Sequence, residues 1–307
     1  MDNNVSYQDE KIKFEDIIEK NVDLSKYTSM GTGGKAQYLT TPGRFEELIT
    51  ALKFAKENNL KITIIGAGSN ILVSDKGIEG LIIRTHHLSR FSTKGNMFCC
   101  RAGMSIEKAI NITLDDSMFG LEGLSGIPGS IGGAIIGNSG ANGHLISDHL
   151  LYVDYITFDG KTHRMGTQVI NFGYRYSSFL DIKDCIIFEA GFGLSNSTDS
   201  FKKSREEQST IKKDRKEKGL FDYSSAGSIF KNPEGKYTAG ELIDSCKLKS
   251  KKIGGAMVSP KHANLIVNYK NASSTDIYKL AELCRATVEK KTRIKLEYEI
   301  KLLGDFT

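Results

Sequence analysis

The chain has 307 residues, a length that predicts two or three domains instead of a single core. Hydrophobic residues make up 39% and charged residues 26%, which excludes a disordered protein and indicates a soluble globular one. The net charge of +5 is too small to indicate a nucleic-acid partner, although it suits an anionic small molecule. Five cysteines without metal-ligand spacing predict free thiols in a reducing cytoplasm and no metal site.

Two segments have features of membrane targeting, and both lack the required composition. The first twenty residues carry charges throughout, so we expect no secretory signal. Residues 123–143 are uncharged and approach the length of a membrane span, but glycines, Pro128 and two asparagines leave few large apolar side chains. We therefore expect a buried glycine-rich loop there, and no membrane insertion.

Hydrophobic periodicity predicts helices mixed with strands along the first half of the chain. Helices are expected at 45–59 and at 104–116, where Ser105 can act as the N-cap. Short strands are expected at 61–65 and, as two pieces, within 71–84. This mixture predicts an α+β or α/β fold.

The second half continues the mixture after a hairpin with its turn at Asp159–Gly160. The polar run 195–219 predicts a solvated helix that crosses between domains. The compact unit that follows is expected to contain two helices, at 238–246 and 274–291, and two strands, at 264–268 and 295–303. In the last strand Glu297 and Glu299 share a face, and spacing alone does not distinguish a functional glutamate from a solvated one.

Two glycine-rich segments have the composition of phosphate-binding loops. In "IIGAGSN", a strand runs into residues 66–70, which offer consecutive amides, a hydroxyl and a side-chain amide to a pyrophosphate. The alternative there is an ordinary strand–turn–strand. In "GIPGSIGGAIIGNSGANG", residues 126–143, the alternative is close helix packing through small residues. Together the two segments favour a large dinucleotide, whereas the missing G-x-G-x-x-G disfavours a Rossmann-type site.

Three further residues are candidates for chemistry. Arg175 lies between two tyrosines in an apolar setting, where it needs a carboxylate or phosphate partner or forms a structural salt bridge. Ser228 lies in "SSAGSIFKNPEGK", which has no histidine or second acid beside its serines to make one a nucleophile. His262 is expected to be a surface histidine or a hydrogen-bonded core histidine.

Seven motifs of this chain resemble, in order, those of one family, the UDP-N-acetylenolpyruvoylglucosamine reductases (UDP-N-acetylmuramate dehydrogenases). The motifs cover Tyr27 to Gly304, and "GIPGSIGG" together with "SAGSIFKNP" is highly specific. The short format between Phe172 and Ser225 is similar to the compact subclass, which lacks an additional tyrosine-bearing loop. The motifs are "YTSMGTGGKAQYLTTP", "IIGAGSNILVSDKGIEGLIIR", "LEGLSGIPGSIGGAIIGNSGANG", "FGYRYSSF", "SAGSIFKNP", "AGELIDSCKLKSKKIGGAMVSPKHANLIVN" and "KLEYEIKLLG".

The resemblance implies an α+β fold with an FAD-binding region in two lobes, of the vanillyl-alcohol-oxidase type, and a smaller α/β substrate-binding domain. We expect the lobes at 1–90 and 91–205 and the C-terminal domain at 206–307. The resemblance also implies tightly bound FAD, NADPH as co-substrate and reduction of UDP-N-acetylglucosamine-enolpyruvate to UDP-N-acetylmuramate for peptidoglycan. A cytoplasmic monomer without nucleic-acid partners is expected.

By resemblance, Arg175 is the catalytic arginine, Ser228 the proton donor and Glu299 the catalytic glutamate. Glu299 would act as a neutral acid, which requires burial to raise its pKa. The residues expected to bind FAD are Gly66, Ala67, Gly68, Ser69, Asn70, Gly126, Ile127, Pro128, Gly129, Ser130, Gly132, Gly133 and Asn138. Those expected to bind the substrate are Tyr174, Arg215, Lys218, Lys231 and Asn232.

The chain departs from the family pattern at three places. Gly219-Leu220 replaces a usual Gln-Pro, Ser224 replaces a common proline, and Asn142 stands where an aromatic residue is frequent. Two alternative functions therefore stay open. One is an FAD-linked oxidase of similar fold that uses oxygen, and the other is a non-catalytic protein that binds nucleotide sugars.

Overall fold

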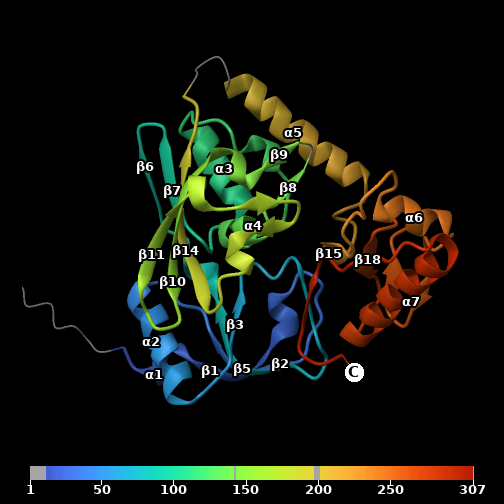
Figure 1. Ribbon diagram of the computed structural model, residues 1–307, viewed down its shortest axis with the longest axis horizontal. Helices are drawn as coiled ribbons and strands as arrows, with labels where there is room; N and C mark the ends of the chain where they lie inside the picture. The colour runs from blue at the N-terminus through green and yellow to red at the C-terminus, as the bar shows by residue number, and fades with distance from the viewer. Residues whose placement is uncertain (1–11, 142, 197–200, 307) are drawn as a thin grey trace, which may run out of the picture.

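The chain folds into three groups of elements that follow one another in sequence (Figure 1). The structure, a computed structural model, describes residues 12–141, 143–196 and 201–306. The first group contains a four-stranded sheet in the order β1–β2–β5–β3, in which β2, β5 and β3 are parallel. Its elements are α1 (Phe14–Ile17), β1 (Glu19–Asp23), β2 (Lys35–Thr40), α2 (Phe45–Glu57), β3 (Ile62–Ile65) and β5 (Ile78–Arg84).

Helix α2 confirms the helix predicted at 45–59. Its apolar face, with Leu48 and Leu52 buried, packs in one core cluster with side chains of β5. The strand predicted at 61–65 and the two within 71–84 are also confirmed. The turn after β3 leads directly into another strand, so no helix follows it, in agreement with the absence of a Rossmann signature.

The second group is built on a five-stranded antiparallel sheet in the order β11–β10–β14–β7–β6, with α3 and α4 in the same core cluster. Ser105 caps α3, since its hydroxyl accepts from the backbone N–H of Lys108 at 3.2 Å, as predicted. The predicted hairpin is formed by β10 and β11. The group comprises β6 (Phe91–Lys94), β7 (Met97–Arg101), α3 (Ile106–Asp115), α4 (Ile131–Ile136), β8 (Gly140–Ala141), β9 (His144–Leu145), β10 (Leu150–Thr157), β11 (Thr162–Gly166) and β14 (Cys185–Gly193).

The glycine-rich segment 123–143, predicted as a buried loop, is buried or half-buried at most of its described residues, but it is not only a loop. It contains the six-residue helix α4, which begins after Ser130, whose hydroxyl accepts from the Gly133 N–H at 3.4 Å. A methyl group on Gly132 would lie 2.8 Å from the Cβ of Ala102. Small residues therefore bring this helix close to the sheet, which is the packing alternative raised from the sequence. Among the described residues no helix is long and apolar enough to cross a membrane.

The third group is smaller and contains a four-stranded sheet in the order β15–β18–β17–β16. Helix α5 leads to it from the second group, across the molecule (Figure 1), and confirms the helix predicted within 195–219 for residues 201–217, whereas residues 197–200 of that prediction lie outside the described residues. Both helices predicted beyond it are confirmed as α6 and α7. The elements are α5 (Phe201–Glu217), β15 (Ser224–Ser228), α6 (Ala239–Ser245), β16 (Lys252–Ile253), β17 (Ala256–Val258), β18 (Leu265–Asn268) and α7 (Ser274–Thr292).

The C-terminal segment was predicted as one strand at 295–303, and this prediction is wrong for its first six residues. Only β19 (Lys301–Leu303) is a regular strand, and it pairs in parallel with β4 (Ile71–Val73) of the first group. Before it, Tyr298 forms an isolated bridge to Phe230 beside β15. The segment passes from the third group to the first, so no single sheet can hold it along its whole length.

A second connection joins the same two groups. Asp75, which follows β4, accepts hydrogen bonds from the backbone N–H groups of Ser274 and Thr275 at 2.9 and 2.8 Å. These are the first amides of α7, so a carboxylate of the first group caps a helix of the third. Met30 and Leu72 of the first group also belong to the core cluster of the third. The fold therefore matches the expected two lobes and smaller domain, while the boundaries at residues 90 and 205 stay predictions.

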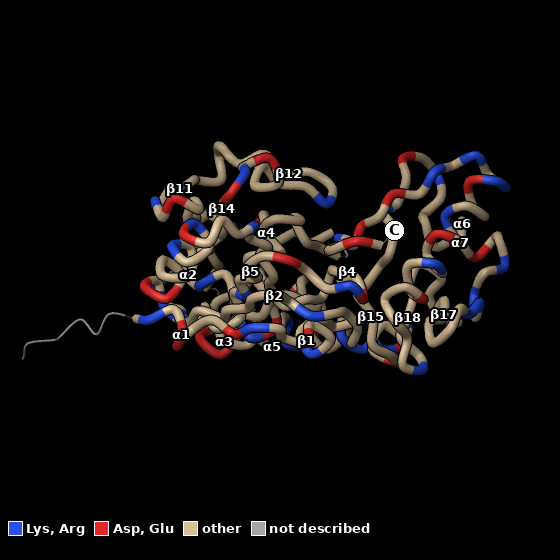
Figure 2. Tube along the Cα trace, turned by 90° about the horizontal axis from the view of Figure 1, so that it is seen from below, with Lys and Arg blue, Asp and Glu red and all other residues tan. Residues whose placement is uncertain are grey.

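Charge is distributed over all three groups. In the view of Figure 2, lysine and arginine are interspersed with aspartate and glutamate along the described chain. All five cysteines are free, and four of them are buried, as the sequence predicts. Among the described residues no cluster of histidine, cysteine, aspartate or glutamate has the arrangement of a metal site.

Candidate active site

Arg175 lies at the tip of a hairpin formed by β12 (Phe172–Gly173) and β13 (Tyr176–Ser177). Its φ angle is +53°, a left-handed conformation that non-glycine residues adopt rarely and often at functional sites. Two hydrogen bonds hold the hairpin against the end of α4, from Asn138 Nδ2 to the Gly173 carbonyl (3.1 Å) and from Ser177 Oγ to the Ile136 carbonyl (2.9 Å). The glycine-rich segment therefore positions the arginine.

Arg175 points to Glu299 and forms an ion pair with it. Arg175 Nε donates to Glu299 Oε1 at 2.5 Å, and the side chains are 28% and 13% exposed. Burial raises the pKa of Glu299 above its usual range and outweighs the opposing attraction of Arg175. The carboxyl group is therefore easier to protonate than an ordinary glutamate.

Ser228 ends β15 and lies beside Glu299. The backbone N–H of Glu299 donates to the carbonyl of Ile229, the residue after Ser228, at 2.8 Å. Among the described residues no hydrogen bond is made by the Ser228 hydroxyl, and Ser228 is half-buried. The backbone at Ser228 therefore runs beside Glu299, which is paired with Arg175.

Glu297 has a different environment from Glu299. Its side chain is 76% exposed, and Lys231 Nζ approaches its Oε2 only to 3.7 Å. The two glutamates were predicted to share one face of a strand, but the irregular segment separates them. Glu299 turns toward Arg175, and Glu297 remains in solvent.

The two glycine-rich segments meet beside this site. Ser69 Oγ donates to the Pro128 carbonyl at 2.9 Å, and a methyl group on Gly66 would lie 2.5 Å from Ser130 Oγ. Asn70 continues the contact to the catalytic candidates, since its Nδ2 donates to the Glu299 carbonyl at 3.3 Å. Residues far apart in sequence thus form one continuous surface.

This surface has the properties that a dinucleotide requires. The backbone amides of Ala67, Gly68 and Ser69 donate no hydrogen bond to any described residue, so they are available to phosphate oxygens. Asn138 is buried, and its Oδ1 has no partner within the described chain. Unpaired buried polar atoms are costly, so an absent ligand is the simplest explanation for these groups. The residues present therefore fit FAD.

The expected substrate residues fall into two places. Tyr174 and Asn232 are joined directly, because the Asn232 N–H donates to the Tyr174 hydroxyl at 3.2 Å across the space between β12–β13 and β15. Lys231 is adjacent to Asn232 and near Glu297. These three residues lie next to the Arg175 site.

Arg215 and Lys218 lie at the end of α5, on the side of the third group. Lys218 is paired with Asp214 at 2.7 Å. Arg215 packs against the second glycine-rich segment, since its Cδ would lie 2.8 Å from a methyl group on Gly126. The Nε of Arg215 is buried and has no hydrogen-bond partner among the described residues. Of the departures from the family pattern, Gly219 has a φ of +73°, and Asn142 lies outside the described residues.

Two arrangements in the region were not predicted from the sequence. Buried Asn264 clamps Phe230, accepting from its N–H at 3.0 Å and donating to its carbonyl at 2.8 Å, and so fixes the chain after Ser228. His262 was expected to be a surface or hydrogen-bonded core histidine. It is half-buried, and its Nδ1 is buried without a partner in the described chain. No sequence pattern marks either arrangement, because both depend on the turn before β18.

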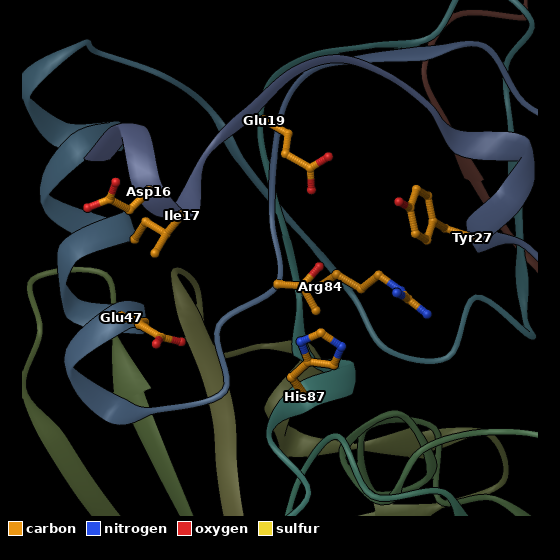
Figure 3. Close-up of a pocket in the computed structure, with 8 residues that line it drawn as sticks. Asp16, Ile17, Glu19, Tyr27, Glu47, Arg84 and His87 are labelled. Atoms are coloured by element: carbon orange, nitrogen blue, oxygen red, sulfur yellow. The ribbon is translucent and has the colours of Figure 1, made fainter. Parts of the chain in front are cut away.

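A pocket of about 590 Å³ lies at the carboxyl edge of the first sheet (Figure 3), and it adjoins the first glycine-rich segment, since a methyl group on Gly68 would lie 2.0 Å from the Tyr27 carbonyl oxygen. The Arg84 guanidinium lies over the ring of Tyr27 at 4.7 Å, with acidic side chains around the opening. Its lining includes none of the predicted site residues. It is lined by Asp16, Ile17, Glu19, Tyr27, Thr41, Glu47, Arg84 and His87.

Comparisons with known proteins identify what this chain resembles. Residues 219–303 match the family described as UDP-N-acetylenolpyruvoylglucosamine reductase, C-terminal domain, and residues 36–166 match the family described as FAD binding domain. The chain is 38% identical to the UDP-N-acetylenolpyruvoylglucosamine reductase of Exiguobacterium sibiricum, over 93% of this chain and 92% of that protein. It is 34% identical to that of Geobacillus thermodenitrificans, over 95% and 94%. The crystal structure of the reductase from Thermus caldophilus superposes with a TM-score of 0.80 at 30% identity, covering 94% of this chain and 99% of that one.

Proposed function

The chain belongs to the UDP-N-acetylenolpyruvoylglucosamine reductase family, and we propose that Arg175, Ser228 and Glu299 carry out its reaction. It is an FAD-dependent oxidoreductase of peptidoglycan precursor synthesis. Its reaction uses NADPH to reduce the enolpyruvyl double bond of UDP-N-acetylglucosamine-enolpyruvate, giving UDP-N-acetylmuramate. The observation that supports these three residues most strongly is the Arg175–Glu299 pair at 2.5 Å beside the Ser228 strand.

The two glycine-rich segments would hold FAD. The free amides of residues 67–69 suit the pyrophosphate, and residues 126–133 together with Asn138 line the same surface. Bound FAD supplies the hydride carrier between NADPH and the alkene. The protein then has to stabilise the charge that this hydride creates on the substrate and to provide one proton.

Arg175 and Glu299 would stabilise that charge. Hydride addition to the outer alkene carbon leaves negative charge on the carbon beside the carboxylate, where it delocalises as an enolate. Arg175 uses Nε for Glu299, so its terminal N–H groups remain for the substrate carboxylate. Glu299 contributes as a neutral acid that donates a hydrogen bond, and its raised pKa favours this form.

Ser228 would deliver the proton. The enolate carbon is basic enough to take a proton from an alcohol, and the serine then recovers one from solvent. This role requires placement more than activation, which agrees with a Ser228 hydroxyl that makes no hydrogen bond in the described chain. Placement follows from the Glu299–Ile229 backbone bond and from the Asn264 clamp on Phe230.

Substrate binding and location are further parts of the proposal. Tyr174, Lys231 and Asn232 would contact the sugar end, because Asn232 is bonded to Tyr174 beside Arg175, and Arg215 and Lys218 the diphosphate, because Arg215 packs against Gly126 of the second glycine-rich segment. Both expected substrates are soluble nucleotides of the cytoplasm, so we place the reaction there. The expectation of a monomer stays a prediction.

Stopped-flow measurement of both half-reactions tests the role of Ser228. In Ser228→Ala we expect flavin reduction by NADPH within about twofold of the wild type, and reoxidation by the enolpyruvyl substrate slower by about 10²–10⁴-fold. Ser224→Ala, a change at an exposed residue of the same strand, is the matched control and should affect neither step. Equal loss in both half-reactions of Ser228→Ala would show that the serine is not the proton donor.

A further inference from the structure

Tyr298 directly precedes Glu299 in the chain, and its side chain lies on the opposite side of the segment. Glu299 pairs with Arg175 of the second group, whereas Tyr298 packs against the core cluster of the third group. Consecutive side chains of an extended segment point to opposite sides, so the direction of one sets the direction of the other. The contacts of Tyr298 therefore affect where the Glu299 carboxyl group lies.

The segment that carries both residues has little regular structure of its own. Residues 293–300 belong to no helix or regular strand, and β19 begins only at Lys301. Two backbone hydrogen bonds join residues 297–299 to the chain after Ser228, from the Lys231 N–H to the Glu297 carbonyl at 2.9 Å and from the Glu299 N–H to the Ile229 carbonyl at 2.8 Å. A segment with so few backbone bonds opens locally more easily than a sheet strand, so side-chain contacts have to fix its orientation.

The Tyr298 hydroxyl is bonded to a helix of the third group. It donates to Glu282 Oε1, on α7, at 2.7 Å. The other oxygen of this carboxylate, Oε2, accepts from Arg285 Nη2 at 2.5 Å, three residues further along the helix. The ion pair therefore orients the Glu282 carboxylate so that Oε1 faces the tyrosine. A hydrogen bond to an ionised group is shorter and stronger than one between neutral groups.

The ring of Tyr298 is held as well. Its centroid lies 5.3 Å from that of Phe230, at an interplanar angle of 35°. Phe230 is itself fixed by Asn264, which bonds both its N–H and its carbonyl. Burial raises the pKa of Tyr298 and the Glu282 hydrogen bond raises it further, so the hydroxyl keeps its proton and stays a donor. Tyr298 is thus held at both its ring and its hydroxyl.

Helix α7 is a firm support for this contact. It is 19 residues long, packs against β16, β17 and β18 (Figure 1), and begins with a capping box formed by Ser273 and Asp276. Its first amides are also bonded to Asp75 of the first group. The hydroxyl of Tyr298 is therefore anchored to a helix that both the third sheet and the first group hold in place.

We propose that Tyr298 is a positioning residue, whose hydrogen bond to Glu282 keeps the adjacent Glu299 carboxyl group buried against Arg175. Tyr298 packs into the core of the third group, so it acts through Glu299 and not on the substrate. This inference rests on the proposed role of Glu299 and adds to it the contact that places this residue. The charged groups that act on Glu299 are Arg175 and Lys231, and the substitutions below change neither.

Tyr298→Phe removes the hydroxyl and keeps the ring, and Tyr278→Phe is the matched control. Tyr278 packs against the same core, its ring lies 5.0 Å from that of Phe306, and its hydroxyl makes no hydrogen bond among the described residues. Stopped-flow reoxidation by the enolpyruvyl substrate should be about tenfold slower in Tyr298→Phe, because Glu299 is no longer held in place, whereas flavin reduction by NADPH should change less than about twofold. Tyr278→Phe should alter neither step.

The pH profile separates positioning from a general loss of stability. Burial raises the pKa of Glu299, so a carboxyl group that moves toward solvent should have a lower pKa. The decline of the reoxidation rate with rising pH should therefore begin at lower pH in Tyr298→Phe than in the wild type. A loosened core alone would lower the free energy of unfolding without moving this decline. A decline that stays at the wild-type pH overturns the inference, whatever the rate.

Substitutions of Glu282 test the partner of the tyrosine. Glu282→Gln keeps an oxygen that can accept from Tyr298, so its reoxidation rate should stay within about twofold of the wild type. Glu282→Leu removes the acceptor and should reproduce Tyr298→Phe. Because both changes remove the same bond, the double variant should be no slower than either single one. Additive losses would contradict a shared hydrogen bond.

The proposed role of Glu299 has its own, distinguishable failure. If Glu299→Ala is reoxidised at the wild-type rate, that role is wrong. If Glu299→Ala is slow and Tyr298→Phe behaves as the wild type, only the inference about Tyr298 fails. If Tyr298→Phe does not retain flavin, Glu282→Leu decides by the same rate and pH measurements.

Discussion

Glu297 and Glu299 lie two residues apart, yet their surroundings differ in every property that matters for chemistry. Glu299 is 13% exposed and contacts Arg175 at 2.5 Å, whereas Glu297 is 76% exposed and only distantly approached by Lys231. Burial raises the pKa of Glu299. The difference shows that the irregular path of the chain between β15 and β4, and not the residue type, determines which carboxyl group is buried against Arg175.

The largest effect in this comparison is expected from alanine substitutions at the two positions. Glu299→Ala should slow reduction of the enolpyruvyl substrate by about 10²–10³-fold, because it removes a donor aimed at developing charge. Glu297→Ala is the matched control and should change the rate less than about twofold. Stopped-flow reoxidation of the reduced enzyme by substrate measures both. A similar decrease in the reoxidation rate in both variants would contradict a catalytic role for Glu299 that Glu297 lacks.

The pH dependence of the rate in Glu299→Gln tests whether Glu299 acts in its neutral form. If neutral Glu299 donates a hydrogen bond, Glu299→Gln keeps a donor and should lose less activity than Glu299→Ala. Because the pKa of Glu299 is raised, the wild-type rate should fall as pH rises through that pKa and the acid ionises. The glutamine variant should lack this decline. A decline that persists in Glu299→Gln would assign it to another group.

A smaller effect is expected from the contact that places Glu299. Asn70 donates to the Glu299 carbonyl at 3.3 Å, and its own carbonyl accepts from the Lys301 N–H at 3.0 Å. Asn70→Ala should slow substrate reduction about tenfold by loosening the position of Glu299. Flavin content, read from the visible spectrum, separates this effect from loss of cofactor. A full rate with normal flavin would show that the contact is dispensable.

The smallest effect concerns stability alone and a third carboxylate at the same interface, Asp75. Burial alone would raise the pKa of Asp75, but hydrogen bonds from Thr275 and Ser274 outweigh it and lower the pKa. Asp75→Asn should reduce the free energy of unfolding by about 1 kcal/mol at pH 7, with activity unchanged. Denaturant titration measures this, with exposed Asp116→Asn as control.

The pH dependence of that loss has a definite sign. A depressed carboxyl pKa stabilises the folded state above the unfolded pKa of about 3.9 and loses this contribution as pH falls through the folded value. The difference between wild type and Asp75→Asn should therefore shrink toward acid pH. A difference that is constant with pH would contradict the assigned hydrogen bonds.

Local sequence patterns predicted the longer helices, but only some of the strands, and they missed long strands such as β14. The helix at 45–59, the helix capped by Ser105 and the hairpin at 152–166 follow from periodicity, caps and turns, which act over a few residues. The prediction failed where the chain passes from pairing with one strand to pairing with a strand of another sheet. Apolar and charged residues alternate along segment 295–303 as they would in a single strand. In the structure, however, the segment first contacts Phe230 beside β15 and then pairs with β4, and the alternation of residue types does not indicate which strand a segment pairs with.

The resemblance supplied the candidate site residues but not their geometry. The resemblance named Arg175, Ser228 and Glu299, yet contact between residues 124 positions apart depends on how two groups of elements pack. The environment of His262 was not predicted, because a single histidine has no periodic signal. Its unpaired Nδ1 became visible only once α5 and the turn before β18 were placed together.

The most direct test of the whole account is an anaerobic visible spectrum of the purified protein. The account predicts that NADPH bleaches a bound flavin, and that UDP-N-acetylglucosamine-enolpyruvate restores the colour with formation of UDP-N-acetylmuramate, whereas UDP-N-acetylglucosamine does not. A colourless protein, or a reduced flavin that only oxygen reoxidises, would contradict it.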